Sequence, residues 1–172
     1  VLIANAGCSV HYFAHGTGIK GSGIRAQQVR EIEPFERVCL QGSGNLLVET
    51  GAKQSVAIEI DDNLLDIITT EVKNGRLVIG CSESYNSPKG LDIHITVPNI
   101  DATSLQGSGN VDLPVFEGET LKIAVAGSGD VSGSGSVGEL SINISGSGDV
   151  DLSNLVANDA DVTIAGSGDV CV

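Results

Sequence analysis

Apolar and polar positions alternate along much of this chain, and the alternation is anchored on a repeated Gly-Ser-Gly triplet. The triplet occurs seven times, beginning at Gly21, Gly42, Gly107, Gly127, Gly133, Gly146 and Gly166. Two residues before it, five of the repeats carry an apolar residue: Leu40, Leu105, Val125, Ile144 and Ile164. Four residues after it, the same repeats are again apolar: Leu46, Val111, Val131, Val150 and Val170. The odd positions are mostly polar, and a period of two predicts β-strands.

The spacing of the triplets predicts a stacked architecture. The starts at Gly107, Gly127, Gly146 and Gly166 are separated by 20, 19 and 20 residues, and a fixed period of this size is typical of a solenoid. The interval before Gly107, back to residue 42, corresponds to about three more steps. We therefore expect a parallel β-helix with rungs of about 20 residues, each holding about three short strands. Both glycines of a triplet would face inward, at a corner where no side chain fits.

The middle of the chain, residues 46–106, lacks the triplet, and we expect irregular rungs there with a hairpin among them. Alternation persists at 55–60, 76–79 and 91–97, and Lys73-Asn74-Gly75 predicts a turn between strands. The best helix candidate is 61–72, but its β-branched residues suit a strand equally well. The predicted fold class is therefore all-β throughout.

Composition and charge exclude several classes of protein. The 172 residues suit one domain. The 41% of hydrophobic residues is too high for a disordered chain, despite the 23 glycines. No apolar run is long enough for a transmembrane helix. The formal net charge of −13 at pH 7 disfavours nucleic acid and anionic lipid as partners, because both are negatively charged.

Several unlike motifs occur in an order that points to a known family. The first motif is residues 29–38 (Val-Arg-Glu-Ile-Glu-Pro-Phe-Glu-Arg-Val), which lead into a strand and Gly-Ser-Gly-Asn. Two further motifs follow at 61–65 (Asp-Asp-Asn-Leu-Leu) and 70–77 (Thr-Glu-Val-Lys-Asn-Gly-Arg-Leu). The closing Gly-Ser-Gly-Asp series is the last. Over about residues 19–172 the chain resembles the "putative auto-transporter adhesin, head GIN domain" family. The resemblance implies a β-helix-like fold, export from a bacterial cell, a cell-surface or periplasmic location, and no established catalytic residues.

The first 18 residues depart from the family pattern. We expect an N-terminal arm at 1–18 and a single head-GIN-like domain at 19–172. The arm begins with the apolar residues Val1, Leu2 and Ile3, which can dock by adding a strand to an open sheet edge, including the edge of another subunit. The alternative is a degenerate lipoprotein signal at 4–8, with Cys8 as the lipid-bearing residue.

The arm also holds a candidate metal site. Cys8, His11 and His15 form C-x2-H-x3-H, a spacing compatible with zinc or copper ligands if a fourth ligand comes from elsewhere. The alternative is an arm whose histidines are incidental. No other cofactor is predicted.

A polar residue follows the triplet directly in the stacked repeats: Asn45, Asn110, Asp130, Asp149 and Asp169. On successive rungs these side chains would form an outward ladder with a spacing of about 5 Å. Like charges that close repel one another, so calcium is a candidate ligand of the ladder. The alternative is turn chemistry, in which Asn and Asp side chains bond their own backbone.

The four cysteines are Cys8, Cys39, Cys81 and Cys171, and an even number in an exported protein is compatible with disulfides. Cys39 and Cys171 fall at odd offsets, so both should face outward, near opposite ends of the stack and too far apart to bond within one chain. One hypothesis is a bridge between Cys8 of one subunit and Cys171 of the next. The alternative is free or intrachain cysteines.

No enzyme motif is supported by its context. Residues 133–138 form a G-x-G-x-x-G pattern, but the sequence that follows alternates like a strand, whereas a dinucleotide site needs a helix there. The leading hypothesis is a non-enzymatic, exported surface protein that assembles with copies of itself end to end, for example as a filament. The alternatives are a monomeric adhesin or envelope lipoprotein that binds a glycan, a protein or calcium, and, third, a carbohydrate-active enzyme.

Overall fold

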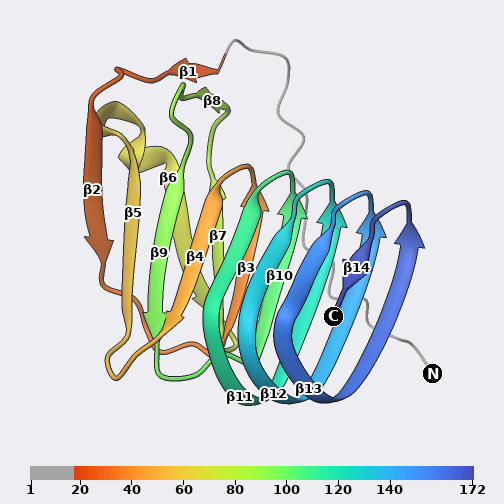
Figure 1. The fold of residues 1–172 in the computed structure, drawn as a ribbon. Coiled ribbons are helices and arrows are strands. Elements are labelled where there is room, and N and C mark those ends of the chain that lie inside the picture. Colours follow the sequence, from red (N-terminus) through yellow and green to blue (C-terminus); the bar gives the residue numbers. More distant parts are fainter. Residues whose placement is uncertain (1–17) are drawn as a thin grey trace, which may run out of the picture.

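Strands dominate the computed structural model, which describes residues 18–172 (Figure 1). Among these residues only η1 (Asp62–Ile67), a short 3₁₀ helix, is helical, so the all-β prediction is confirmed. The strands that precede the regular repeats are β1 (Ile19–Lys20), β2 (Arg25–Arg30), β3 (Arg37–Gly42), β4 (Asn45–Thr50), β5 (Ser55–Asp61), β6 (Ile68–Lys73), β7 (Arg76–Cys81), β8 (Tyr85–Asn86) and β9 (Asp92–Val97). Within the described part of the chain, no helix has the length and apolarity that crossing a bilayer requires.

The regular repeats pair in parallel and in the register that the triplets predict. They comprise β10 (Ala102–Gly107), β11 (Asn110–Gly127), β12 (Val131–Gly146), β13 (Val150–Gly166) and β14 (Val170–Cys171). Val125 pairs with Leu105 on one side and with Ile144 on the other, and Ile144 pairs in turn with Ile164. Equivalent apolar residues of successive repeats therefore lie side by side, which is why one alternating pattern can be repeated.

Each regular repeat differs from the prediction of three short strands. β11, β12 and β13 are single strands of 18, 16 and 17 residues, and they bend into arcs (Figure 1). A register shift between Leu113 and Phe116 interrupts the pairing of β11 with β12. A Cβ on Gly135 would overlap the backbone of Phe116, so the triplet at Gly133 lets two strands curve closely together and does not form a corner. Glycine bends the strand here without ending it.

The middle of the chain does not supply further rungs between the triplets at Gly42 and Gly107. Strand β3 pairs directly with β10, with Leu40 opposite Leu105. Residues 55–97 form the antiparallel pairs β6 with β7 and β5 with β9, and β7 and β9 also pair in parallel with β3 and β4. The predicted turn is confirmed, since Asn74 and Gly75 have φ of 52° and 71°, the conformation that a tight hairpin requires. The hairpin that this turn closes also joins the parallel stack, because β7 pairs with β3 as well as with β6.

The helix candidate at 61–72 divides into two elements, η1 and β6, which meet at Ile67 and Ile68. The short helix packs inward, because Leu64 and Ile67 are buried. Arg30 of β2 donates from Nη2 to the carbonyls of Leu65 (2.8 Å) and Ile68 (3.3 Å). These bonds tie the edge strand β2 to η1 and to the first residue of β6.

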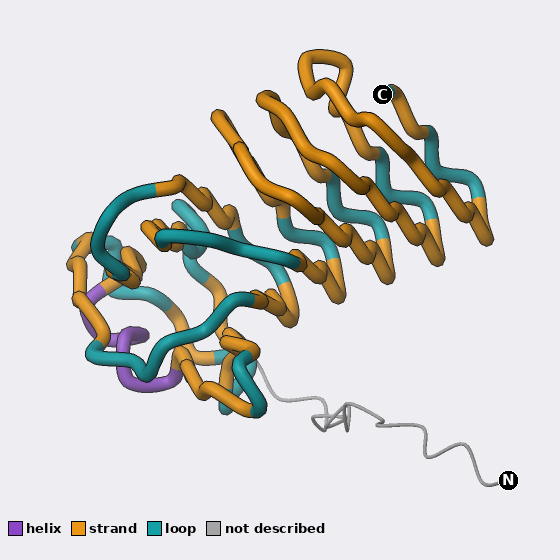
Figure 2. Tube along the Cα trace, turned by 90° about the horizontal axis from the view of Figure 1, so that it is seen from below, coloured by secondary structure: helices purple, strands orange, loops and turns teal. Residues whose placement is uncertain are grey.

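The large sheet curls until it is nearly closed. Its path runs β2-β5-β9-β4-β11-β10-β3-β7-β6, with β12, β13 and β14 continuing from β11, and β1 and β8 form a separate parallel pair. The two halves of the path meet on β11, whose start pairs with β4 and whose end pairs with β10. One continuous apolar core fills the interior. Figure 2 shows η1 at one end of the molecule and the C-terminus at the other.

Candidate functional site

The predicted polar ladder lies along one side of the stack and is built by the turns of the triplets. The amide of Asp149 donates to Oδ1 of Asp130 at 3.0 Å, and the amide of Asp169 donates to Oδ1 of Asp149 at 2.8 Å. Each carboxylate therefore accepts a backbone bond from the next repeat. These bonds join neighbouring repeats, 19 and 20 residues apart in the chain, and so differ from the local turn bonds of the alternative interpretation.

The stacked glycines let the turns approach this closely. A Cβ on Gly129 would overlap the carbonyl oxygen of Gly109, and a Cβ on Gly148 would overlap that of Gly129. Between them, the amide of Ser128 donates to the carbonyl of Gly107 at 2.9 Å. The first glycine of the triplet also has a positive φ, for example 139° at Gly127, which other residues rarely adopt. The prediction that no side chain fits at this corner is confirmed.

At the other end of the row, asparagines replace the aspartates. Nδ2 of Asn110 donates to Oδ1 of Asn45 at 3.2 Å, and Nδ2 of Asn45 donates to Oδ1 of Asp92 at 2.9 Å. Because an amide can both donate and accept, the two asparagines connect side chain to side chain. This connection extends the row to β9, which the triplet alignment did not include.

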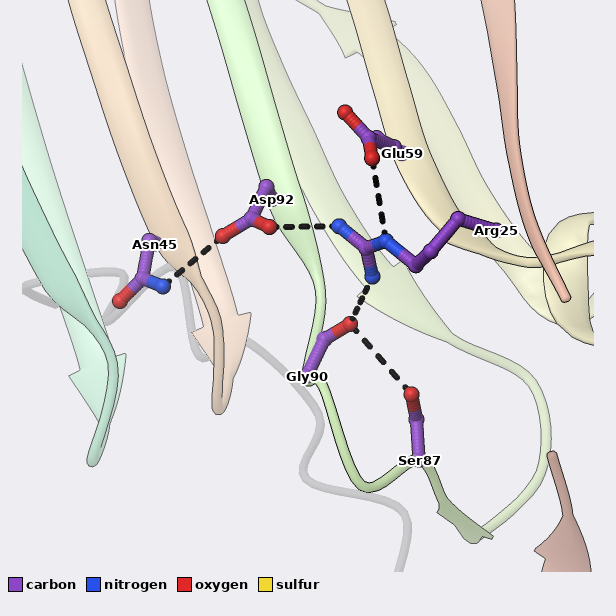
Figure 3. Close-up of polar contacts among 6 residues, drawn as sticks. All are labelled: Arg25, Asn45, Glu59, Ser87, Gly90 and Asp92. Carbon is purple, nitrogen blue, oxygen red and sulfur yellow. Dashed lines mark hydrogen bonds and ion pairs between the residues drawn. The ribbon is translucent and has the colours of Figure 1, made fainter. Parts of the chain in front are cut away.

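Arg25 ends the row and neutralises it locally (Figure 3). Its Nη2 lies 2.5 Å from Oδ2 of Asp92, its Nε lies 3.1 Å from Oε1 of Glu59, and its Nη1 donates to the carbonyl of Gly90 at 2.6 Å. The side chain of Arg25 is only 16% exposed. Charge-assisted bonds in such a half-buried position are stronger than surface ion pairs. Sequence patterning gave no signal for this residue, because its partners come from β5 and β9.

A shallow groove of about 800 Å³ runs beside the row. Its lining combines the row with the next outward position of each strand: Asn45, Leu46, Leu47, Asp92, Ile93, His94, Asn110, Val111, Asp112, Asp130, Val131, Ser132, Asp149 and Asp151. Five of these side chains are carboxylates, and none is Phe, Tyr or Trp. The groove therefore suits positively charged groups, and it lacks the aromatic platform on which sugar rings usually stack.

Asp151 is one of the five carboxylates that line this groove. The hydroxyl of Ser153 donates to Oδ1 of Asp151 at 2.7 Å, and the amide of Ser153 donates to the same atom at 3.1 Å. These two bonds lower the pKa of Asp151 below its ordinary value, since they stabilise the ionised form. Asp151 therefore stays charged into moderately acidic solution.

Comparison with known proteins identifies the family. The sequence profile of the "putative auto-transporter adhesin, head GIN domain" family matches residues 34–172, most of the chain. The chain belongs to this family. The match begins later than the expected residue 19, so β1 and β2 lie outside it. No curated protein matches the sequence of the chain.

Solved structures share the fold of this head GIN domain. A protein from Bacteroides fragilis described as a putative adhesin is 16% identical, with a TM-score of 0.59 over 89% of this chain and 99% of its own. A putative adhesin from Parabacteroides distasonis is also 16% identical, with a TM-score of 0.57 over 88% and 83%. A protein of the same species described as a putative lipid binding protein is 22% identical, with a TM-score of 0.60 over 88% and 83%. At these identities the likeness shows the fold alone.

Several predicted sites of the head GIN domain chain lie outside the described residues. They are the assembly arm (Val1, Leu2 and Ile3) and the candidate metal ligands (Cys8, His11 and His15), so these predictions stay untested. Between residues 18 and 172, no three His, Cys, Asp or Glu side chains are grouped so that they could hold a metal ion.

The burial of Cys39 was not expected from its predicted outward-facing position. Cys39 alternates with the core residues of β3 and so lies on the outer face, as predicted, but it is 1% exposed. It is flanked along the strand by Arg37 and Gln41 and across it by Val78 and Ser104. A short side chain in such a row is covered by its longer neighbours.

The other two described thiols differ in environment. Cys171 is exposed on β14 and carries a free thiol, as does the half-buried Cys81. Burial raises the pKa of the Cys81 thiol above its ordinary value. Cys171 is therefore the more accessible of these two thiols.

The last repeat of the head GIN domain exposes residues that are buried in every other repeat. Val162 and Ile164 of β13 are 39% and 43% exposed, whereas their partners on β12, Ile142 and Ile144, are 0% and 2% exposed. Among residues 18–172, only two residues, those of β14, pair beyond β13. In this part of the chain most of β13 is therefore an edge strand without a neighbour, and its apolar row is uncovered. The alternation predicts these residues to face inward but says nothing of what covers them.

Proposed function

We propose that this head GIN domain protein is a non-enzymatic β-solenoid of the bacterial cell surface that assembles with copies of itself end to end. The open edge of β13 is the observation that carries the proposal. A long strand with free backbone groups beside exposed Val162 and Ile164 is a template for another strand. Family membership supports an adhesive or structural role over catalysis.

The two ends of the stack differ, which favours a head-to-tail contact. At the far end η1 covers the interior with Leu64 and Ile67, and the edge strands β2 and β6 belong to antiparallel pairs. A contact between unlike ends is heterologous, and it propagates into an open filament when it does not close into a ring.

The arm at residues 1–18 is the proposed donor strand. Val1, Leu2 and Ile3 have the apolar character that would cover Val162 and Ile164 of a neighbouring subunit. The exposed thiol of Cys171 lies on β14, next to the open edge. A Cys8–Cys171 bridge would then lock one subunit to the next, in an oxidising compartment.

Assembly can be tested with matched variants of the full chain, compared by sedimentation velocity and electron microscopy. We expect wild type to form fibres as concentration rises, and the double substitution Val162→Lys with Ile164→Lys to remain monomeric. Val156→Lys is the control, because Val156 lies on the same strand and is 69% exposed, but pairs with the exposed Ser136 on the outer face. Dispersed wild-type monomers at high concentration would refute the proposal, as would fibres from the double variant.

The disulfide can be tested separately on non-reducing gels. We expect ladders of covalent oligomers from oxidised wild type and their loss in Cys171→Ser and in Cys8→Ser. Fibres that form without covalent ladders would contradict the disulfide hypothesis and would leave the strand-addition mechanism supported.

The acidic groove supports a second candidate function, that of an adhesin that binds a partner on its side. Five carboxylates and the absence of Phe, Tyr and Trp from its lining favour a basic protein surface over a neutral glycan. A lysine-rich peptide should bind wild type and lose affinity in an Asp112→Asn, Asp151→Asn variant. A glycan array that gives binders while the peptide does not would reverse this preference.

A further inference from the structure

Three of the nine basic residues of this acidic chain line one pocket on the outer face of the sheet. They are Arg37 of β3, Arg76 of β7 and Lys122 of β11. The pocket has a volume of about 570 Å³, which lies within the range of sites for small ligands, about 300–1,000 Å³. It is separate from the acidic groove, because the two share no lining residue.

The pairing of the strands sets these basic residues in one row. Arg76 is the direct partner of Arg37. Ala102 pairs with Arg37 on one side and with Lys122 on the other. Because neighbouring strands lie about 4.8 Å apart, the two arginines stand side by side and the lysine lies two strands beyond Arg37. The short side chain of Ala102 leaves the space between them open.

The two arginines repel each other, and no carboxylate of the described chain pairs with either of them. Like charges directly opposite on neighbouring strands are destabilising. Arg76 and Lys122 make no side-chain hydrogen bond or ion pair within residues 18–172. Nη2 of Arg37 donates to the carbonyl of Asn74, and its Nε and Nη1 have no bond to the described residues. An anion held by both guanidinium groups would replace this repulsion with charge-assisted bonds.

Two carboxylates, Glu36 and Asp101, also line this pocket. Neither pairs with a basic residue of the described chain, and Oδ1 of Asp101 accepts instead from Nδ2 of Asn99 at 2.7 Å. Three basic and two acidic side chains leave the lining with one net positive charge. The pocket therefore suits a single anionic group and not a polyanion, which the formal net charge of −13 would also repel.

Uncharged polar side chains line another part of the pocket: Ser104, Thr120, Ser141 and Asn143. Within the described chain these four side chains make no hydrogen bond. Their hydroxyl and amide groups can donate to an anionic oxygen, and they can also bond hydroxyl groups of the molecule that carries the anion. A pocket of this volume has room for part of such a molecule beside the anionic group.

We propose that this pocket binds a sulfate or phosphate group, with Arg37 and Arg76 as its principal ligands and Lys122 as a third positive charge. A tetrahedral group offers oxygens to both arginines at once, and the guanidinium fork can bond two of them, whereas lysine acts as a point charge. Distant carboxylates weaken the attraction little, because physiological salt screens charges beyond about 8 Å. No residue of β13 lines the pocket, so binding does not depend on end-to-end assembly.

The test is calorimetric titration of sodium sulfate and of sodium phosphate into the full chain at constant ionic strength, with sodium chloride as the reference salt. Wild type should bind at least one of the two anions, at one site per chain. Arg76→Gln should weaken this binding at least about tenfold. In buffer without either anion, Arg76→Gln should melt at or above the wild-type temperature, because it removes one of two like charges.

The source of the anionic group is tested with glucose 6-sulfate and glucose 6-phosphate in the same titration. If either binds wild type more tightly than the matching inorganic anion, the group is recognised on a sugar whose hydroxyl groups contact the polar side chains. Equal or weaker binding assigns the site to the free anion. Both outcomes support an anion site and differ only in what carries the anion.

Lys89→Gln is the matched control, because it changes the net charge by the same amount as Arg76→Gln. Lys89 is exposed and does not line the pocket, so the affinity should change less than about twofold. Lys122→Gln should weaken binding less than Arg76→Gln does. The proposal would be overturned if neither anion bound wild type more tightly than chloride, or if the affinity survived Arg76→Gln. It would also be overturned if Lys89→Gln and Arg76→Gln lost affinity equally, or if Arg76→Gln were the less stable protein without anion.

Discussion

The amide of Asp149 donates to the carboxylate of Asp130 across two successive repeats, at 3.0 Å. This bond offsets the repulsion that two carboxylates so close would otherwise suffer, because each backbone N–H carries a partial positive charge. The row of aspartates is thus a property of the turns.

The role of this bond can be separated from that of the charge. Asp130→Ala removes the acceptor and should lower the free energy of unfolding by about 0.5–1.5 kcal/mol. Asp130→Asn keeps an oxygen acceptor and removes a like charge, so its stability should equal or exceed that of wild type. Urea unfolding of both variants at low ionic strength measures the difference. Equal destabilisation by the two substitutions would show that the charge itself is required.

The stacked glycines should be the positions least tolerant of a methyl group. In Gly129→Ala the new Cβ would meet the carbonyl oxygen of Gly109, and backbone cannot move aside as a flexible side chain can. We expect a loss of about 3 kcal/mol or more, seen as a lower melting temperature by circular dichroism. Ser128→Ala, at the exposed neighbouring position, should change stability by less than about 0.5 kcal/mol. A Gly129→Ala variant as stable as this control would contradict the close packing of the turns.

Arg25 should matter more than an ordinary surface arginine, because it bonds two carboxylates and a carbonyl from a half-buried position. Arg25→Ala should cost about 1.5–3 kcal/mol of stability. Arg25→Lys keeps the charge but not the fork of donors, so its loss should be intermediate. Chemical unfolding of the three proteins gives the order. If Arg25→Lys is as stable as wild type, the contribution of Arg25 to stability comes from its charge alone and not from the donor geometry in Figure 3.

The pKa of Asp151 gives a pH-dependent test. Because Ser153 lowers this pKa in the folded protein, its bonds contribute stability above the unfolded pKa, and this contribution is lost as pH falls through the folded value. In Ser153→Ala the pKa of Asp151 should rise toward its ordinary value, as followed by NMR titration. The stability difference between the two proteins should shrink in acid. A pKa of Asp151 that is unchanged in the variant would assign the shift to another cause.

The sequence predicted the regular part of this structure closely. Leu40, Leu105, Val125, Ile144 and Ile164 were aligned by their offset from the triplet, and they are partners in the parallel pairing. The turn at Asn74-Gly75 was also predicted from the sequence. In-register stacking gives each repeat the same surroundings, so the same residue type is required every 19 or 20 positions.

The contacts between unlike segments were decided only by the tertiary structure. The triplets at Gly21 and Gly133 fall outside the aligned repeats, and the alignment does not say that one lies against η1 and the other beside Phe116. Cys39 is buried by neighbours on β7 and β10, and Asp61 is enclosed by segments 40 residues before it and 25 residues after it. A repeated pattern specifies what equivalent positions share. The burial of a single residue depends on chain segments far away in sequence, which no local pattern records.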